Sequence, residues 1–245
     1  MIHDGLVVLI HYGLYLIPGL LLCGFWFGLV PGTQPALRMM ILLLTFVLLR
    51  DAMTPLGLWS LSGDLQIGFI ANPFVLTVLG GLSLGLVALL AWRVPSLWQR
   101  VVWFRGNRIA GPVLGVAIGC LIGLPLRLYQ GIEPAAIAGY WSWFPAMLVL
   151  AYGANALEEV LFRGFLQGYL EQQVSLLRAA LISAVAFSAC HAFLALTVTQ
   201  LGWPVLLFTL LEGLACALVR MRHGVLASTA THGTAILLIA VPMAG

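Results

Sequence analysis

A succession of apolar stretches, most of them close to the length of a membrane span, is the feature that most limits how this chain can fold. About 20 apolar residues in a helix cross the hydrocarbon core of a bilayer. Hydrophobic residues make up 62% of the sequence and charged residues 8%, against about 45–50% and about 25% in an ordinary soluble domain. The sequence therefore predicts an all-α polytopic transmembrane protein of about eight spans, surrounded by the lipid bilayer. The predicted spans are residues 6–30, 36–50, 67–92, 109–128, 138–163, 179–199, 203–220 and 224–243.

The basic residues predict an orientation, since all 11 of them are arginines spread along the chain. Four lie in residues 93–108, between the third and fourth predicted spans, which places that loop in the cytoplasm. Counting spans outward from this loop puts nine of the 11 arginines on the cytoplasmic side and leaves Arg50 and Arg127 outside. Both termini then face away from the cytoplasm, as expected of a multi-pass protein of the cell membrane.

The organisation is that of a single transmembrane domain over residues 1–245, because no soluble segment or internal repeat interrupts the apolar stretches. The formal net charge of +3 is small and dispersed, so we expect no nucleic acid partner. Nothing in the sequence indicates an oligomeric state.

Ionisable residues within the predicted spans concentrate in the second half of the chain, and such residues are usually functional. Glu159 and Arg163 are four residues apart, in the order that favours an ion pair on one helix face. Glu158 is rotated by about 100° from Glu159 and lacks that partner. Glu159 is thereby held as a carboxylate, while Glu158 is left able to exchange protons.

Two histidines on later spans are predicted to lie in the same cytoplasmic half of the membrane. His191 lies about 18 Å into its span and His232 about 12 Å into its own, at 1.5 Å per residue. A carboxylate and two imidazoles from three helices are groups that can activate a water molecule and hold a developing oxyanion. The sequence therefore predicts that Glu158, His191 and His232 meet around one small cavity.

These residues carry a resemblance to a known family. Glu158-Glu159-Val-Leu-Phe-Arg163-Gly resembles the EExxxR signature of the CAAX-protease and bacteriocin-processing (Abi) family of intramembrane glutamate-type proteases. Phe187-Ser-Ala-Cys-His191 is similar to the family's FxxxH motif, and His232 occupies the position of its third motif, HxxxN or HxxxD. The resemblance covers roughly residues 140–245, so residues 136–245 are expected to form the protease core and residues 1–135 to form helices of unassigned role.

What the resemblance implies is an intramembrane endopeptidase that cleaves a peptide bond in a membrane-associated protein or peptide, without a cofactor. Carried over, Glu158 activates the water, His191 assists it, His232 helps to bind the oxyanion, and Arg163 fixes Glu159 and the helix end. The chain departs from the third motif at Ile236, where the family has an amide or an acid. Thr231 and Thr234 are the nearby side chains that can supply a replacement donor.

Three further residues are expected to line the same cavity. Glu212 lies in the middle of an apolar span, where it is either protonated and bonded to a neighbouring helix or takes the place of the polar group missing at Ile236. Asn155 precedes Glu158 by one turn, and Phe187 precedes His191 by one turn, so each shares a face with a predicted site residue.

Other functions remain open from the residues alone. Two histidines and one glutamate also make a zinc site, so a Zn2+-dependent hydrolase with Glu158, His191 and His232 as ligands is one alternative. A non-catalytic transporter or scaffold of the same fold is another, favoured by the isoleucine at 236. A thiol enzyme that uses Cys190 is disfavoured, because adjacent helical residues point about 100° apart and His191 could not act as its base.

Overall fold

The computed structural model describes residues 2–131 and 139–243. The described helices are α1 (Ile2–Leu29), α2 (Pro35–Asp51), α3 (Pro73–Arg93), α4 (Pro95–Trp98), α5 (Ala110–Gln130), α6 (Tyr140–Glu159), η2 (Val160–Leu166), α7 (Gln167–Leu170), α8 (Leu176–Cys190), η3 (Leu194–Val198), α9 (Trp203–His223) and α10 (Val225–Ile239). Three short strands accompany them, β1 (Trp59–Leu61), β2 (Ile67–Phe69) and β3 (Ala240–Pro242).

The prediction of an all-α polytopic membrane protein is confirmed. Within the described residues, six helical segments are long and apolar enough to cross a membrane. Helix α1 leaves most of its surface bare of other protein, and most of its exposed side chains are large apolar residues that suit contact with lipid. The two other predicted spans are helical but shorter, with 17 residues in α2 and 15 in α10, so the count of eight stays a prediction.

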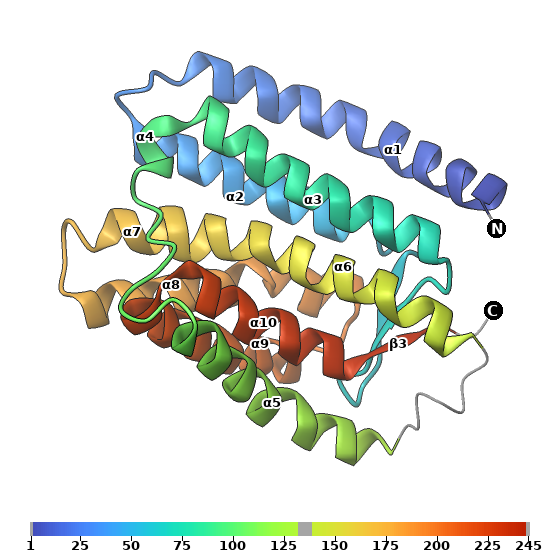
Figure 1. The fold of residues 1–245 in the computed structure, drawn as a ribbon. Coiled ribbons are helices and arrows are strands. Elements are labelled where there is room, and N and C mark those ends of the chain that lie inside the picture. Colours follow the sequence, from blue (N-terminus) through green and yellow to red (C-terminus); the bar gives the residue numbers. More distant parts are fainter. Residues whose placement is uncertain (1, 132–138, 244–245) are drawn as a thin grey trace.

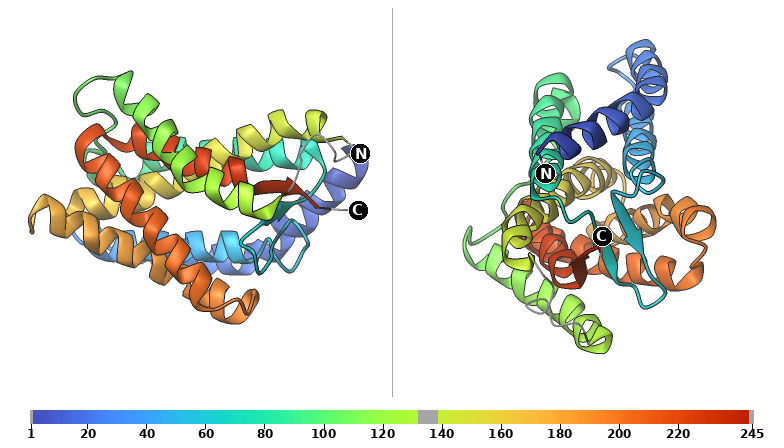
Figure 2. Two further views of the ribbon diagram at one scale, coloured as in Figure 1. Left: turned by 90° about the horizontal axis from the view of Figure 1, so that it is seen from below. Right: turned by 90° about the vertical axis from the view of Figure 1, so that its right-hand side faces the viewer.

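The helices run back and forth between the two ends of an elongated bundle (Figure 1). Helices α1, α2 and α3 lie on one side, α5, α9 and α10 on the other, and α6 passes between them (Figures 1 and 2). The described N- and C-terminal ends lie at the same end of the bundle, as the alternation of spans predicts. Which end faces the cytoplasm stays a prediction.

A three-stranded sheet at the end of the bundle that carries both termini corrects two predicted spans. β1 and β2 form an antiparallel hairpin, and β3 pairs in parallel with β2. The predicted span 67–92 therefore begins too early, because residues 67–69 are strand β2 and α3 begins at Pro73, capped by Asn72. The predicted span 224–243 ends too late, because α10 stops at Ile239 and the chain continues as β3.

The boundaries of two further spans differ from the prediction. The helical segment that begins with α6 continues through η2 and α7 to Leu170 instead of ending at residue 163. The predicted span 179–199 is interrupted at His191, where α8 gives way to η3. Residue 138 and the predicted boundary between 1–135 and 136–245 lie outside the described residues.

Close packing between neighbouring helices of the bundle depends on glycine. A Cβ atom on Gly80 of α3 would lie 2.7 Å from the carbonyl oxygen of Val149 on α6, so the two backbones touch there. A Cβ atom on Gly115 of α5 would collide with the Ala227 carbonyl oxygen on α10. Small residues allow such approach where no hydrophobic effect drives helices together in lipid.

Candidate active site

The adjacent glutamates at the end of α6 point into different surroundings. Glu158 lines a cavity between the two halves of the chain, and its Oε2 atom is buried without a hydrogen-bond partner. Glu159 is fully buried and faces the packed helices on the other side. The divergence predicted from helical geometry is therefore observed, and Glu158 is the carboxylate that a molecule in the cavity would meet.

Glu159 holds a buried polar network together. Its Oε1 atom lies 3.2 Å from Arg163 Nη1, and the hydroxyl of Ser228 on α10 donates to its Oε2 atom. Arg163 in turn donates from Nη2 to the Gly213 carbonyl of α9 at 3.0 Å, and its guanidinium lies 4.4 Å from the centre of the Phe187 ring. The ion pair expected from the sequence thus fastens α6 and η2 to α9 and α10.

The ion pair crosses a change of helix type. Glu159 is the last residue of α6, and the next seven residues form the π-helical segment η2, all of them buried. Insertions of π-helix into α-helices are frequent at functional sites. Here the wider turn lies directly beside Glu158.

His232 lies between two carboxylates. Its Nδ1 atom is 2.9 Å from Glu159 Oε1, and its Nε2 atom is 3.6 Å from Glu212 Oε2. The first contact is a hydrogen bond, whereas the second exceeds hydrogen-bond length and is electrostatic only. His232 is therefore fixed at Nδ1, and it is one of the residues that line the cavity.

His191 is oriented by its own helix. Its Nδ1 atom lies 2.8 Å from the Phe187 carbonyl oxygen, and its ring lies 4.6 Å from that of Phe187. A carbonyl oxygen only accepts, so this contact requires the proton on Nδ1 and leaves a lone pair on Nε2. Because His191 also lines the cavity, that lone pair is available to a bound molecule.

Phe187, expected to line the cavity, lies behind it. The side chain is fully buried and packs edge-on against Phe162 and His232, at 5.0 Å and 5.6 Å between ring centres. It is not among the described residues that line the cavity. Its contribution is therefore to support both imidazoles from the protein side.

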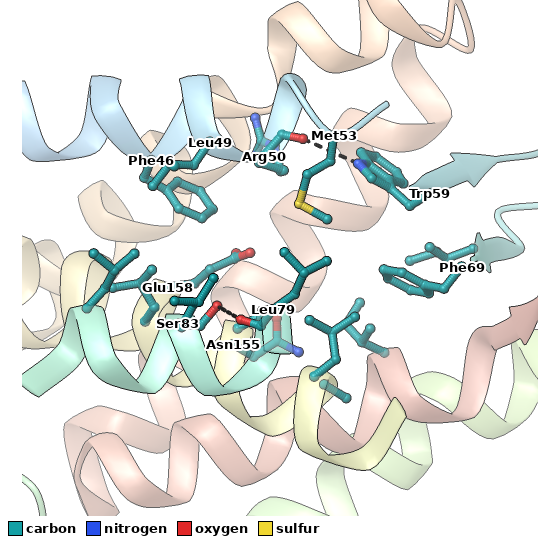
Figure 3. Close-up of a pocket in the computed structure, with 18 of the residues that line it drawn as sticks. Phe46, Leu49, Arg50, Met53, Trp59, Phe69, Leu79, Ser83, Asn155 and Glu158 are labelled. Atoms are coloured by element: carbon teal, nitrogen blue, oxygen red, sulfur yellow. Dashed lines mark hydrogen bonds between the residues drawn. The ribbon is translucent and has the colours of Figure 1, made fainter. Parts of the chain in front are cut away.

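The cavity has a volume of about 610 Å³, within the range of about 300–1,000 Å³ typical of ligand pockets. Figure 3 shows Glu158 and Asn155 on one wall, facing Phe46, Arg50 and the β1–β2 hairpin. The polar groups from the second half of the chain are few and lie among many aliphatic and aromatic side chains. They are Asn155, Glu158, His191, Thr209, Glu212 and His232.

Sequence reasoning missed the contribution of the first half of the chain. Arg50 of α2 lines the cavity, and its Nη2 atom donates to the Cys190 carbonyl at 2.8 Å. The sequence placed Arg50 on the outer surface, as one of two arginines that broke the charge asymmetry. That exception to the positive-inside pattern was the available signal that Arg50 has a local role.

Thr231 and Thr234, considered from the sequence as replacement oxyanion donors, both have hydrogen-bond partners within the protein. The Thr231 hydroxyl donates to the Ala227 carbonyl of its own helix at 3.1 Å, and the Thr234 hydroxyl lies 2.8 Å from that of Tyr152. Neither threonine is among the described cavity-lining residues, whereas Ile236 and Glu212 are.

Glu158, His191 and His232, the zinc ligands proposed from the sequence, are not the residues whose donor atoms lie closest together. Among the described residues, the donor atoms within 4.8 Å of one another belong to Glu159, Cys216 and His232. The carboxylate of this set already pairs with Arg163, whose positive charge would repel a metal ion. The set that the structure brings together is thus a poor fit to zinc.

Comparison with known proteins finds a family match in the second half of the chain. Residues 140–238 match the family of Rce1-like proteins, described as type II CAAX prenyl endopeptidases. This segment is therefore similar to the CAAX proteases. The family resemblance noted in the sequence is thereby confirmed, and the Rce1-like segment contains every cavity-lining polar residue of the second half. No curated protein and no solved structure matches the chain.

Proposed function

We propose that the protein is an intramembrane endopeptidase that hydrolyses a peptide bond in a membrane-associated protein or peptide. The observation that carries the proposal is the position of Glu158, a carboxylate with an unpaired oxygen in a largely apolar cavity that His191 also lines. The similarity of residues 140–238 to the CAAX proteases supports the same reaction class. A prenylated peptide that ends in a CAAX sequence is accordingly the first substrate to test.

In the proposed reaction, Glu158 accepts a proton from a water molecule while the water oxygen adds to the carbonyl carbon of the substrate. The lone pair on His191 Nε2 accepts a hydrogen bond from the same water and orients it. Glu158 then returns the proton to the leaving nitrogen as the carbon–nitrogen bond breaks. One water is consumed, and a carboxyl group and an amine are produced.

The negative charge that develops on the substrate oxygen needs donors, and two cavity residues can supply them. His232 can donate from Nε2 as the imidazolium, because its Nδ1 proton is already donated to the Glu159 carboxylate. Asn155 is 5% exposed and its Nδ2 atom has no acceptor in the described protein. Rotation by 180° about the last side-chain bond of Asn155 exchanges the positions of Nδ2 and Oδ1. The carboxamide can therefore direct its N–H groups toward a bound oxyanion.

Glu212 has a supporting part in this proposal. Its carboxyl group lies 3.6 Å from His232 Nε2 and one of its oxygens is unpaired. Glu212 helps to hold the His232 imidazole in position. It thereby replaces the polar side chain that the family motif has at the position of Ile236.

The deciding experiment compares the purified protein with its Glu158→Gln variant in cleavage of a farnesylated CAAX peptide, followed by mass spectrometry. Loss of cleavage in the variant supports the proposal, and cleavage that persists contradicts it. A chelator added to the same assay tests the zinc alternative, because inhibition that added Zn2+ reverses would favour a metallohydrolase. A wild-type protein that cleaves no peptide would favour a transporter or scaffold.

A further inference from the structure

Arg50 is the cationic side chain that the first half of the chain contributes to the cavity. It lies near the C-terminal end of α2, outside the Rce1-like segment, and faces Glu158 across the cavity (Figure 3). Arg50, Glu158 and His191 all line this cavity. Any molecule bound at the proposed catalytic groups therefore lies within reach of the Arg50 guanidinium.

The guanidinium is held rigidly in place. Its Nε atom is 2.9 Å from Asp51 Oδ1, its Nη2 atom donates to the Cys190 carbonyl, and its carbon lies 5.3 Å from the centre of the Phe46 ring. The carbonyl of Arg50 accepts a hydrogen bond from the Trp59 indole at 3.3 Å. A donor group fixed by this many contacts loses little freedom when it binds a ligand.

One edge of this fixed group has no partner. The Arg50 Nη1 atom is buried without a hydrogen bond, whereas Nε and Nη2 are both occupied. A buried N–H group that lacks an acceptor is unfavourable, and a guanidinium forms its strongest hydrogen bonds with anionic oxygen. The vacant edge therefore favours a ligand that brings a carboxylate.

We propose that Arg50 binds the free C-terminal carboxylate of the peptide substrate, an inference that rests on the proposed peptidase function. The apolar walls from α1, α2, α3 and the β1–β2 hairpin surround the short apolar segment that precedes this carboxylate. The carboxylate would accept a hydrogen bond from Nη1, while Nε stays paired with Asp51. The first half of the chain thus selects chain ends over internal segments of a protein.

This selection sets where cleavage falls. With the chain end fixed at Arg50 and the water activated at Glu158, the scissile bond lies a few residues before the C-terminus. The product that leaves is a short apolar peptide with a free carboxylate.

The test measures binding, so that it does not depend on catalysis. The probes are the tripeptide Val-Ile-Met with a free carboxylate and the same tripeptide with a C-terminal amide, titrated into full-length Glu158→Gln protein in detergent by calorimetry. We expect the acid to bind roughly 10- to 100-fold more tightly than the amide. Adding Arg50→Gln should lower the affinity for the acid to that for the amide, and Arg50→Lys should retain part of the preference.

The matched control is Arg93→Gln, which removes an exposed arginine at the end of α3 and should keep the full preference. Equal affinity for acid and amide overturns the proposal, as does failure of both peptides to bind. An Arg50→Gln variant that weakens both peptides equally shows a structural role instead. If the acid preference stands but protein with Glu158 intact cleaves no CAAX peptide, the protease proposal alone fails.

Discussion

Glu159 Oε1 and His232 Nδ1 lie 2.9 Å apart, although 73 residues separate them in the chain. This hydrogen bond gives the two adjacent glutamates separate tasks. Glu159 fixes the imidazole on α10 and the guanidinium of Arg163, whereas Glu158 faces the cavity with one oxygen unpaired. A Glu→Gln substitution should therefore affect activity at position 158 and stability at position 159.

Glu158→Gln should lower kcat by about 10²–10⁴-fold, because it removes the proposed base. It should leave resistance to unfolding in detergent unchanged, since the carboxyl oxygen that it replaces has no hydrogen-bond partner. The measurements are turnover of the CAAX peptide and a thermal unfolding curve of the purified variant.

Glu159→Gln is the matched variant and should be destabilised by about 3–5 kcal/mol, because it leaves the Arg163 guanidinium buried without its counterion. A Glu159→Gln protein as stable as the wild type would contradict the assignment of Glu159 to the architecture. So would a Glu158→Gln protein that lost stability while it kept its turnover.

His191→Ala should reduce kcat by about 10²-fold, because no other group would orient the water through Nε2. Cys190→Ser provides the neighbouring control. The Cys190 thiol is not among the described cavity-lining groups, and its carbonyl, which accepts from Arg50, is unchanged by the substitution. Initial rates at saturating peptide for both variants test the difference, and a Cys190→Ser enzyme without activity would instead revive the thiol mechanism.

Asn155→Ala should lower kcat by about 10²-fold with little change in KM, because the carboxamide is proposed to bind the oxyanion only as charge develops. Ile236 lies four residues after His232 on α10 and lines the same cavity. An amide introduced there should therefore restore part of the turnover, so the informative protein is the double variant Asn155→Ala, Ile236→Asn. Equal kcat in the single and double variants, with both folded, would count against the donor role.

Gly80→Ala should destabilise the bundle by about 1–3 kcal/mol, because the added methyl group would meet the backbone of Val149 and Leu150 at 2.7–2.9 Å and neither can move aside. Gly81→Ala, one residue later in α3, places its methyl group in open space and should leave stability unchanged or slightly higher. Unfolding in increasing concentrations of a denaturing detergent compares the two variants. Equal losses at both positions would show that helix α3 itself, and not its contact with α6, is affected.

The spans were predictable because hydrophobic length is a property of local sequence, and α1, α5 and α9 lie close to where their apolar stretches indicated. The sheet was not predictable in the same way. Residues 240–242 are apolar enough to extend α10, and they become strand β3 because they pair in parallel with β2, which is far away in the sequence. Such pairing depends on tertiary contact that no local window contains.

In the candidate site, too, local geometry was predictable from the sequence and tertiary packing was not. The positions of Glu158, Glu159 and Arg163 relative to one another follow from helical geometry, so the sequence predicted which glutamate is paired. The place of Arg50 depends on how α2 packs against α8, which the sequence could not indicate. Phe187 shares a helix face with His191 as expected, but which of the two borders the cavity depends on the bulk of Phe162 and Arg163 behind them.

The parallel pairing of β3 with β2 joins the end of α10 to the hairpin that forms one wall of the cavity. Trp59 and Phe69 of that hairpin face the interior of the cavity, and His232 lies on the helix that leads directly into β3. A substrate that displaced the hairpin on entry would pull on α10 and shift the imidazole at its centre. The proposed oxyanion donor and one wall of the proposed substrate cavity are therefore joined through a continuous, hydrogen-bonded stretch of backbone.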